Sequence, residues 1–481
     1  MKTKSTLAEI PLLPRRHFLW RSGGGLGALA LAWLLNDEGL GVGEDGGFGP
    51  KRSHFPGPAK RVLHIFAAGG VSHLDTFDYK PDLAKHDGQA LTDKGEIDTF
   101  FGKPGNLMKS PWQFRRRGGS GLWVSDLLPH LATCADDLCL IQSMVAKSSN
   151  HTPATFQMNT GFVRNGFPSM GSWISYGLGA ESHDLPAFVV LPDPRGLPAG
   201  GSINWTAGFL PAAQQGVAFR HTGDPILDLK TPESVSPGRR QAEMELVSRM
   251  NQEHLESYPG DSTLAARIRS YQLAARMQLS VPDIVNLKDE GPEVQKRYGL
   301  DHEVTAGFGR NCLLARRLLE RGVRMVQVWN GGAFGRPRIN WDAHEDIVDN
   351  HTTQAATMDR PLAGLLTDLR ERGMLDDTLV VWSTEFGRTP VTQGFGATGR
   401  DHHQHAFTCW LAGAGVKKGF RHGVTDEVGF NVAEDPVTVY DFHATILHLL
   451  GLDHKKLTFY HNGIQRRLTD VHGHVVEALL A

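Results

Sequence analysis

Residues 61–70, RVLHIFAAGG, form a short apolar run that ends in two glycines. A run of this length with glycine at its end is typical of a strand that is buried on both faces of a sheet. The same pattern recurs along the chain in DLCLIQSM (137–144), AFVVLPD (187–193), VRMVQVWNGG (323–332), DTLVVWSTEFG (377–387) and AFTCWLAGAG (406–415). The sequence therefore predicts a buried sheet built from these runs.

Helical segments precede several of these runs, at residues 127–135, 308–321 and 352–372. Strands that alternate with helices predict an α/β fold of three layers, in which helices cover both faces of a mainly parallel sheet. Residues from about 235 to 300 differ, because they are charged, rich in Gln and helical in period. We interpret them as a helical insertion within one domain that spans residues 60–475.

The composition is that of a soluble globular protein, with 40% apolar and 21% charged residues. The formal net charge of −2 does not suggest a polyanionic partner, and since nucleic-acid binders usually show a basic face, we expect no nucleic-acid partner. Four cysteines in 481 residues do not make a disulfide framework, and we expect them to be small buried residues.

The N-terminal segment, residues 1–35, has the features of a twin-arginine export signal. RRHFLW (15–20) precedes an apolar stretch at 24–35, which is too short to span a membrane comfortably. Residues 36–59 are rich in Gly, Pro and Asp and are interpreted as a linker. We therefore expect a periplasmic or extracellular protein, in contact with the membrane only through the signal if it is not cleaved; an amphipathic first helix is the alternative.

Polar side chains gather where the predicted strands end. In open parallel sheets ligands bind outside the carboxyl ends of the strands, so these loops are candidate sites. Carboxylate together with imidazole is the donor mixture that suits zinc, manganese or iron. Each cluster alone is weak evidence, because Asp and His also cap helices and an acid such as Glu385 also pairs with an arginine. The clusters are Ser72–His73–Asp75, Ser149–His151–Thr152, Asp342–His344, Glu385–Arg388 and the run GRDHHQHAF (399–407).

The chain from about 60 to 475 resembles the exported sulfatase-like family known as domain of unknown function 1501, a branch of the alkaline-phosphatase and sulfatase superfamily. The resemblance rests on these motifs: GGVSHLDTFDYKP, NHTPATFQMNTG, PSMGSWISYGLG, FGRNCLLARRLLERGVRMVQV, WDAHED, STEFGRTP, GRDHHQHAFTCWLAGAGVKKG and YDFHATILHLLGLD. It implies an alkaline-phosphatase-like sheet with divalent metal ions at the strand ends and a nucleophile at a helix N-terminus.

The resemblance also implies roles for individual residues. The metal ligands would be Asp342, His344, Glu385 and His402, with Asp401 supporting or binding and Asp75, or else His73, completing the set. His151 falls where the nucleophile is expected; it would be a ligand or the nucleophile itself, unless a neighbouring hydroxyl such as Thr152 replaces it. Arg388 would hold an anionic oxygen of the substrate, or else pair with Glu385. His403 and His405 are interpreted as bystanders.

Three departures from the family pattern bear on activity. Alanines end the first predicted strand where a ligand aspartate is usual, Phe386 stands where a ligand histidine is expected, and no sulfatase Cys-x-Pro-Ser-Arg motif is present. We therefore carry two hypotheses. One is a metal-dependent hydrolase or transferase of phosphate, phosphonate or sulfate esters, acting on a small anionic ester or a modified glycan. The other is a non-catalytic binding or scaffold protein with a structural metal site.

Overall fold

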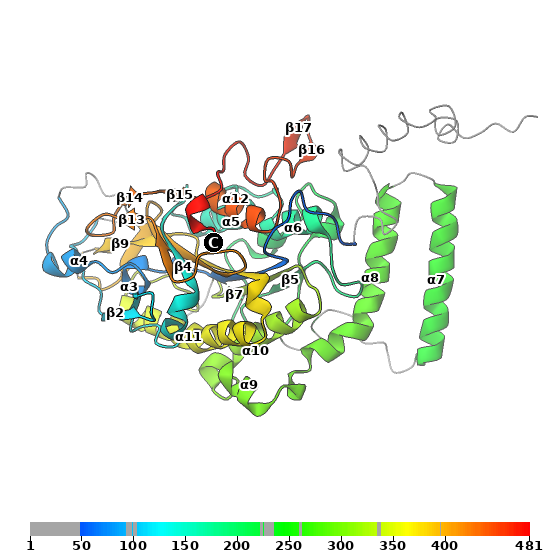
Figure 1. Ribbon diagram of the computed structural model, residues 1–481, viewed down its shortest axis with the longest axis horizontal. Coiled ribbons are helices and arrows are strands. Elements are labelled where there is room, and N and C mark those ends of the chain that lie inside the picture. The colour runs from blue at the N-terminus through cyan, green and yellow to red at the C-terminus, as the bar shows by residue number, and fades with distance from the viewer. Residues whose placement is uncertain are drawn as a thin grey trace, which may run out of the picture. The chain divides into compact units, whose positions relative to one another are not determined.

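The computed structural model describes residues 49–481, apart from 93–98, 100–102, 222–224, 226–234, 259–261, 334–337 and 395. The predicted export signal and most of the predicted linker lie outside these residues. A nine-stranded sheet in the order β12-β4-β11-β8-β1-β7-β5-β6, with β15 beside β4, forms the centre (Figure 1).

The sheet is mainly parallel, as the sequence predicts. Strand β11 is the exception, because it runs antiparallel to both β4 and β8. Every predicted run contains one strand of this sheet, and three short strands join its edges. Its strands are β1 (Arg61–Ala67), β4 (Leu138–Val145), β5 (Phe188–Leu191), β6 (Val217–Ala218), β7 (Met325–Asn330), β8 (Thr378–Ser383), β11 (Phe407–Gly413), β12 (Phe420–His422) and β15 (Val437–Thr438).

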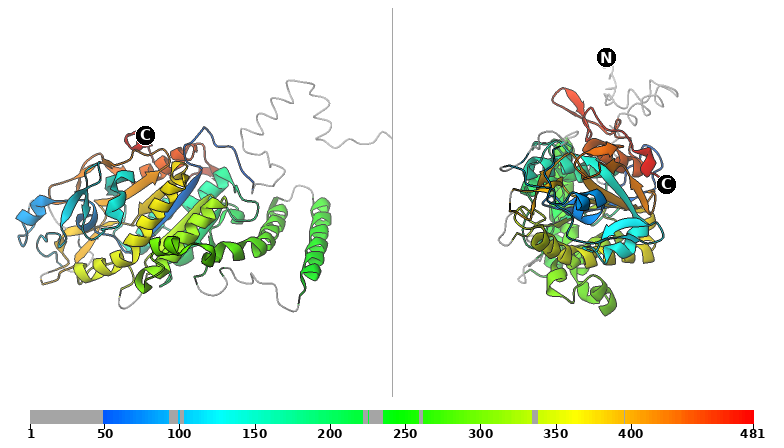
Figure 2. Two further views of the ribbon diagram at one scale, coloured as in Figure 1. Left: turned by 60° about the horizontal axis from the view of Figure 1, so that its bottom comes forward. Right: turned by 90° about the vertical axis from the view of Figure 1, so that its left-hand side faces the viewer.

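Helices cover both faces of the sheet, which confirms the predicted three layers. On β1, Leu63 and Ile65 join one core and Val62 and Phe66 join the other, so the strand contributes apolar side chains to both faces. Figures 1 and 2 show α10 and α11 on one face and α5, α6 and α12 on the other. These helices are α5 (His151–Thr160), α6 (Met170–Leu178), α10 (Glu303–Glu320), α11 (Ile347–Glu371) and α12 (Val439–Leu449).

One predicted helix is wrong in type. Residues 127–135 do not form an α-helix; a 3₁₀ helix, η1, covers Leu131–Asp137 instead. The carboxylate of Asp359 accepts the N–H groups of His130 and Leu131, at 2.8 and 2.7 Å, and this fixes the start of the turn. The helical stretch at 235–300 contains α7 (Pro237–Ser257), α8 (Ser262–Val285) and α9 (Pro292–Arg297).

Short elements complete the described part of the chain, and one ribbon matters for the site. Strands β9 (Gly387–Thr392) and β10 (Arg400–His403) pair antiparallel and place His402 opposite Arg388. The remaining short α-helices and strands are α3 (His73–Thr76), α4 (Pro81–Lys85), β2 (Phe114–Arg117), β3 (Leu122–Ser125), β13 (Val424–Thr425), β14 (Val432–Glu434), β16 (Phe459–His461) and β17 (Ile464–Arg466).

The loop after β7 packs directly on the end of β1. The Trp341 N–H donates to the carbonyl of Ala68 at 2.9 Å. Gly69 has φ +118, and a Cβ there would lie 2.5 Å from the Trp341 nitrogen. Only glycine tolerates both the backbone conformation and the close approach. The glycines that end the first apolar run therefore bring the loop that carries Asp342 to the carboxyl edge of the sheet.

Two further observations concern the whole described region. The four cysteines are buried and unpaired. Across the residues that the structure describes, no helix has the length and apolar character needed to span a membrane.

Candidate metal centre

Four donor atoms from three separate segments converge on one point. Oδ1 of Asp342 lies 2.8 Å from Nε2 of His344, 3.1 Å from Nε2 of His402 and 3.3 Å from Nε2 of His151. The Nε2 atoms of His344 and His402 are 2.9 Å apart. These side chains are largely buried, with His151 the most accessible at 25%.

The sheet positions each contributor. His151 is the first residue of α5, which follows β4, and Asp342 and His344 lie in the loop between β7 and α11. His402 comes from β10, whose Arg400 N–H donates to the carbonyl of Ala343 at 2.9 Å. Since β11 is antiparallel, the segment before it reaches the same edge as the loops after β4, β7 and β8.

Hydrogen bonds fix the orientation of the imidazoles of His402 and His344. Nδ1 of His402 lies 2.7 Å from the carbonyl of Ser149, and Nδ1 of His344 lies 2.5 Å from Oε1 of Gln393. Both partners are acceptors, so Nδ1 carries the proton in each ring. In the neutral form of each ring, Nε2 then carries the lone pair that a cation would bind.

The imidazole of His151 is oriented by Glu385. Its Nδ1 lies 2.8 Å from Oε1 of Glu385, which also accepts the N–H of Gly69 at 2.8 Å. The other oxygen of Glu385 accepts the hydroxyl of Thr384 at 3.3 Å. A carboxylate behind a histidine is the arrangement that orients histidine ligands in metal sites. Glu385, predicted as a ligand, is placed behind His151 rather than among the four converging atoms.

The surroundings shift the pKa values of three side chains in the centre in different directions. Burial would raise the pKa of Asp342, but Arg388 and the three imidazoles outweigh burial and hold this pKa far below its usual range. Burial, reinforced by the charge of Arg388, lowers the pKa of His402 to about 2. Burial also opposes protonation of His151, yet the neighbouring carboxylates of Asp342 and Glu385 outweigh it and raise its pKa to about 9.

Asp342 and the imidazoles around it supply donors that suit a divalent cation. Two groups that could hold an ion are found among the described residues, His151–Asp342–His402 and His344–Asp401–His402. Donors about 2.0–2.1 Å from a tetrahedral zinc ion lie roughly 3.3 Å from one another, close to the observed 2.8–3.3 Å. Nε2 of His151 is buried without a hydrogen-bond partner. Imidazole and carboxylate donors suit zinc, manganese or iron.

Asp75 lies apart from this cluster, although the sequence points to it as a ligand. Its carboxylate accepts Nε of Arg400 at 2.8 Å and the hydroxyl of Ser72 at 2.5 Å. Both partners of the ion pair are fully buried. Asp75 belongs to neither candidate group among the described residues, so its charge is used to neutralise Arg400.

Asp401 and Arg388 support the centre from behind. Asp401 Oδ1 accepts the backbone N–H of His402 at 2.7 Å and lies 3.9 Å from Nδ1 of His344. Arg388 is fully buried and donates to the carbonyls of Gly69, Gly70 and Arg400 and to Oδ1 of Asp342 at 2.8 Å. The structure thus directs the guanidinium of Arg388 to protein acceptors.

The remaining predicted residues lie as follows. Thr152 is half-buried beside His151 in the first turn of α5. The ring of Phe386 is buried, with centroids 5.0 Å from His151 and 4.6 Å from His402, so it forms an apolar wall. His403 bonds to the carbonyl of Phe430, away from Asp342.

Sequence reasoning missed two contributors, Gln393 and Arg338. Gln393 orients His344, and Arg338 reaches the other carboxylate oxygen, Oδ2 of Asp342. No motif marks either residue. The only feature of the sequence that could have indicated the ion pair of Arg338 with Asp342 is their four-residue spacing.

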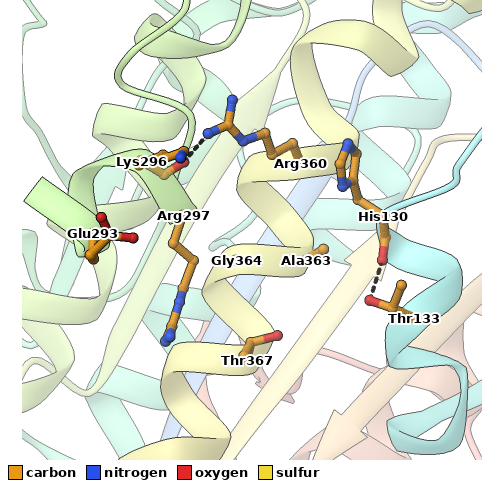
Figure 3. Close-up of a pocket in the computed structure, with 9 residues that line it drawn as sticks. All are labelled: His130, Thr133, Glu293, Lys296, Arg297, Arg360, Ala363, Gly364 and Thr367. Atoms are coloured by element: carbon orange, nitrogen blue, oxygen red, sulfur yellow. Dashed lines mark hydrogen bonds between the residues drawn. The ribbon is translucent and has the colours of Figure 1, made fainter.

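A separate surface hollow of about 370 Å³ lies between η1, α9 and α11 (Figure 3). Arg360 donates there to the carbonyl of Lys296 and pairs with Asp301 at 2.9 Å, and Arg297 pairs with Glu371. Its arginines are therefore engaged by the protein, and its lining residues include none of the converging ligands.

Comparison with known proteins identifies the family. The family model described as "Protein of unknown function (DUF1501)" matches residues 59–480, and the chain belongs to this family. No curated protein matches the sequence of the chain.

Solved structures share low similarity with this chain. The lipoteichoic acid synthase LtaP from Listeria monocytogenes is 11% identical, with a TM-score of 0.34, over 89% of this chain and 80% of its own. A variant of TAB5 alkaline phosphatase with Mg bound is 10% identical, with a TM-score of 0.35, over 82% and 99%. The phosphonate monoester hydrolase SpPMH from Silicibacter pomeroyi is 13% identical, with a TM-score of 0.33, over 82% and 73%. We transfer no residue role at such scores.

The contrast between Asp75, which pairs with Arg400, and the candidate ligand His402 gives a first prediction. His402→Ala should lose zinc, because it removes one of the four donors. Asp75→Asn should keep zinc but lower the free energy of unfolding by about 3–5 kcal/mol, because it leaves the buried charge of Arg400 unpaired. Zinc content by elemental analysis and urea unfolding measure both effects.

Asp82→Asn is the matched control, because its ion pair with Lys85 lies in solvent and its loss should change neither quantity. Loss of zinc from Asp75→Asn, without loss of stability, would show instead that Asp75 is a ligand.

The raised pKa of His151 gives a second prediction, on pH. The proton on His151 must leave before Nε2 can bind a cation, so the proton competes with zinc below pH 9. Zinc affinity of the metal-free protein should therefore rise about tenfold per pH unit from pH 7 toward 9 and then level off. Glu385→Gln removes one of the acceptors that raise this pKa and should flatten the slope. An affinity that is constant from pH 7 to 9 in the wild type would contradict the account.

Proposed function

We propose that this protein is a metal-dependent hydrolase or transferase of phosphate, phosphonate or sulfate esters. The convergence of the Asp342 carboxylate with the imidazoles of His151, His344 and His402 carries the proposal. A divalent ion held there would act as a Lewis acid toward an oxygen of the transferred group. The substrate would be a small anionic ester or a sulfated or phosphorylated glycan.

The start of α5 supports the same chemistry. The first N–H groups of a helix have no partner within the helix, and the helix dipole favours negative charge at this end. His151 is the first residue of α5 and brings that end of the helix to Asp342. Thr152 is the next residue, and we propose its hydroxyl as the nucleophile.

We also propose that the protein acts outside the cytoplasm. The support is in the sequence alone: the paired arginines at 15 and 16, followed by the apolar stretch at 24–35. An export signal of this kind would deliver the protein to the periplasm or beyond.

A panel of phosphate mono- and diesters, phosphonate esters and sulfate esters, assayed with zinc- or manganese-loaded protein, tests the enzymatic proposal. We expect turnover of at least one class. Glu385→Gln should lower kcat/KM by about 10- to 100-fold, because it only loosens the orientation of His151, and His402→Ala should lower it further. Thr152→Ala should abolish turnover, whereas Thr152→Ser should retain it.

His474→Ala is the control for a histidine substitution, because its side chain is 89% exposed; its kcat/KM should equal that of the wild type. Stoichiometric metal with no turnover of any ester would refute the enzymatic proposal.

One arrangement favours the second candidate, a non-catalytic protein that binds an anionic glycan or a partner. Four protein donors close around one point, as in structural metal sites, whereas catalytic sites usually keep one position open. In that case removal of the metal would lower stability, and metal-loaded protein would turn over no ester.

A further inference from the structure

A second arginine, Arg338, contacts the Asp342 carboxylate of the metal centre. Its guanidinium donates to Oδ2 of Asp342, the oxygen opposite the one that faces the three imidazoles. Its other nitrogens hold the Glu345 carboxylate in a bidentate pair, with Nε 3.2 Å from Oε2 and Nη2 3.1 Å from Oε1. Arg338 therefore binds two carboxylates, one in the centre and one outside it.

The two carboxylates differ sharply in accessibility. The side chain of Asp342 is 10% exposed, whereas that of Glu345 is 72% exposed and that of Arg338 is 38% exposed. An ion pair with so exposed a partner contributes little to stability, because water and salt screen it. Another anion can therefore replace Glu345 on the guanidinium at small cost.

The backbone of Arg338 is fixed even though its side chain is exposed. Nε2 of Gln354, which is fully buried, donates to the Arg338 carbonyl at 3.2 Å. The same glutamine accepts Nη1 of Arg195 at 2.9 Å, but the carboxylate partner of Arg195 is Asp193, only 1% exposed. The pair of Arg195 is built into the protein, whereas the pair of Arg338 is open to exchange.

We propose that Arg338 binds the anionic oxygens of the ester at the metal centre, and that Glu345 occupies this position when no ester is bound. A guanidinium presents two parallel N–H groups, which match two oxygens of a tetrahedral phosphoryl or sulfuryl group as well as they match a carboxylate. Arg388, to which the sequence assigns this role, is fully buried and directed to backbone carbonyls. The inference rests on the proposed function and names the specificity residue of that site.

The test is isothermal titration of the metal-loaded full chain with inorganic phosphate and, separately, with sulfate; the anion that binds more tightly indicates the class of ester. Glu345→Gln removes the competing carboxylate and should tighten binding about two- to fivefold, in keeping with the small strength of an exposed pair. Arg338→Gln should weaken binding at least about tenfold, because it removes a charge-assisted bidentate contact. Arg338→Lys should fall between them, since it keeps the charge and loses the fork.

Glu243→Gln is the matched control, because Glu243 pairs with the exposed Arg239 on α7 and its loss should leave anion affinity unchanged. A misfolded variant cannot bind more tightly, so the opposite signs expected for Glu345→Gln and Arg338→Gln exclude a merely structural effect.

The inference is overturned if Arg338→Gln binds the anion as well as the wild type does, or if Glu345→Gln binds it no better. Either result leaves the proposed function standing whenever the wild type still hydrolyses an ester. If the wild type binds neither anion and hydrolyses no ester, both the inference and the proposed function fail.

Discussion

The candidate metal centre depends on a positive charge that balances the closely packed acceptor atoms of Asp342 and the imidazoles around it. The imidazoles of His344 and His402 donate their Nδ1 protons outward, so in the neutral rings the Nε2 atoms direct lone pairs inward. Those atoms lie 2.9 Å from each other and within 3.1 Å of an oxygen of Asp342. Acceptors packed so closely in a buried place repel one another unless a positive charge lies among them. The raised pKa of His151 indicates that a proton on this ring supplies part of that positive charge. A divalent cation would supply more of it.

The fold is built to hold these repelling groups together. Gly69 allows the loop of Asp342 to pack against the end of β1, and β10 bonds to the backbone of Ala343 within that loop. Behind the donors, Arg388 ties the same region to the carbonyls at the end of β1. Each of these contacts uses backbone or a fully buried side chain. The loop that carries Asp342 and His344 is therefore tied to the edge of the sheet, which is the kind of support that a preorganised metal site needs.

The sequence predicted the fold well and the site in part, for reasons that individual residues make clear. Apolar runs such as residues 61–70 report burial on both faces, so the strands and their layers followed from them. The position of a carboxylate after a strand, however, does not predict whether it binds a metal ion, a histidine or an arginine. Glu385 and Asp75 have the same sequence signature as Asp342, yet one orients His151 and the other neutralises Arg400. Those partners are distant in the chain, so only the folded structure can separate ligands from their supports.

X-ray absorption at the zinc edge of the metal-loaded protein tests the central claim most directly. A cation among His151, Asp342, His344 and His402 should give a first shell of nitrogen and oxygen at about 2.0–2.1 Å. Outer-shell scattering should correspond to three imidazole rings. A first shell with a single imidazole or none would contradict the account, because the cation would then lie elsewhere.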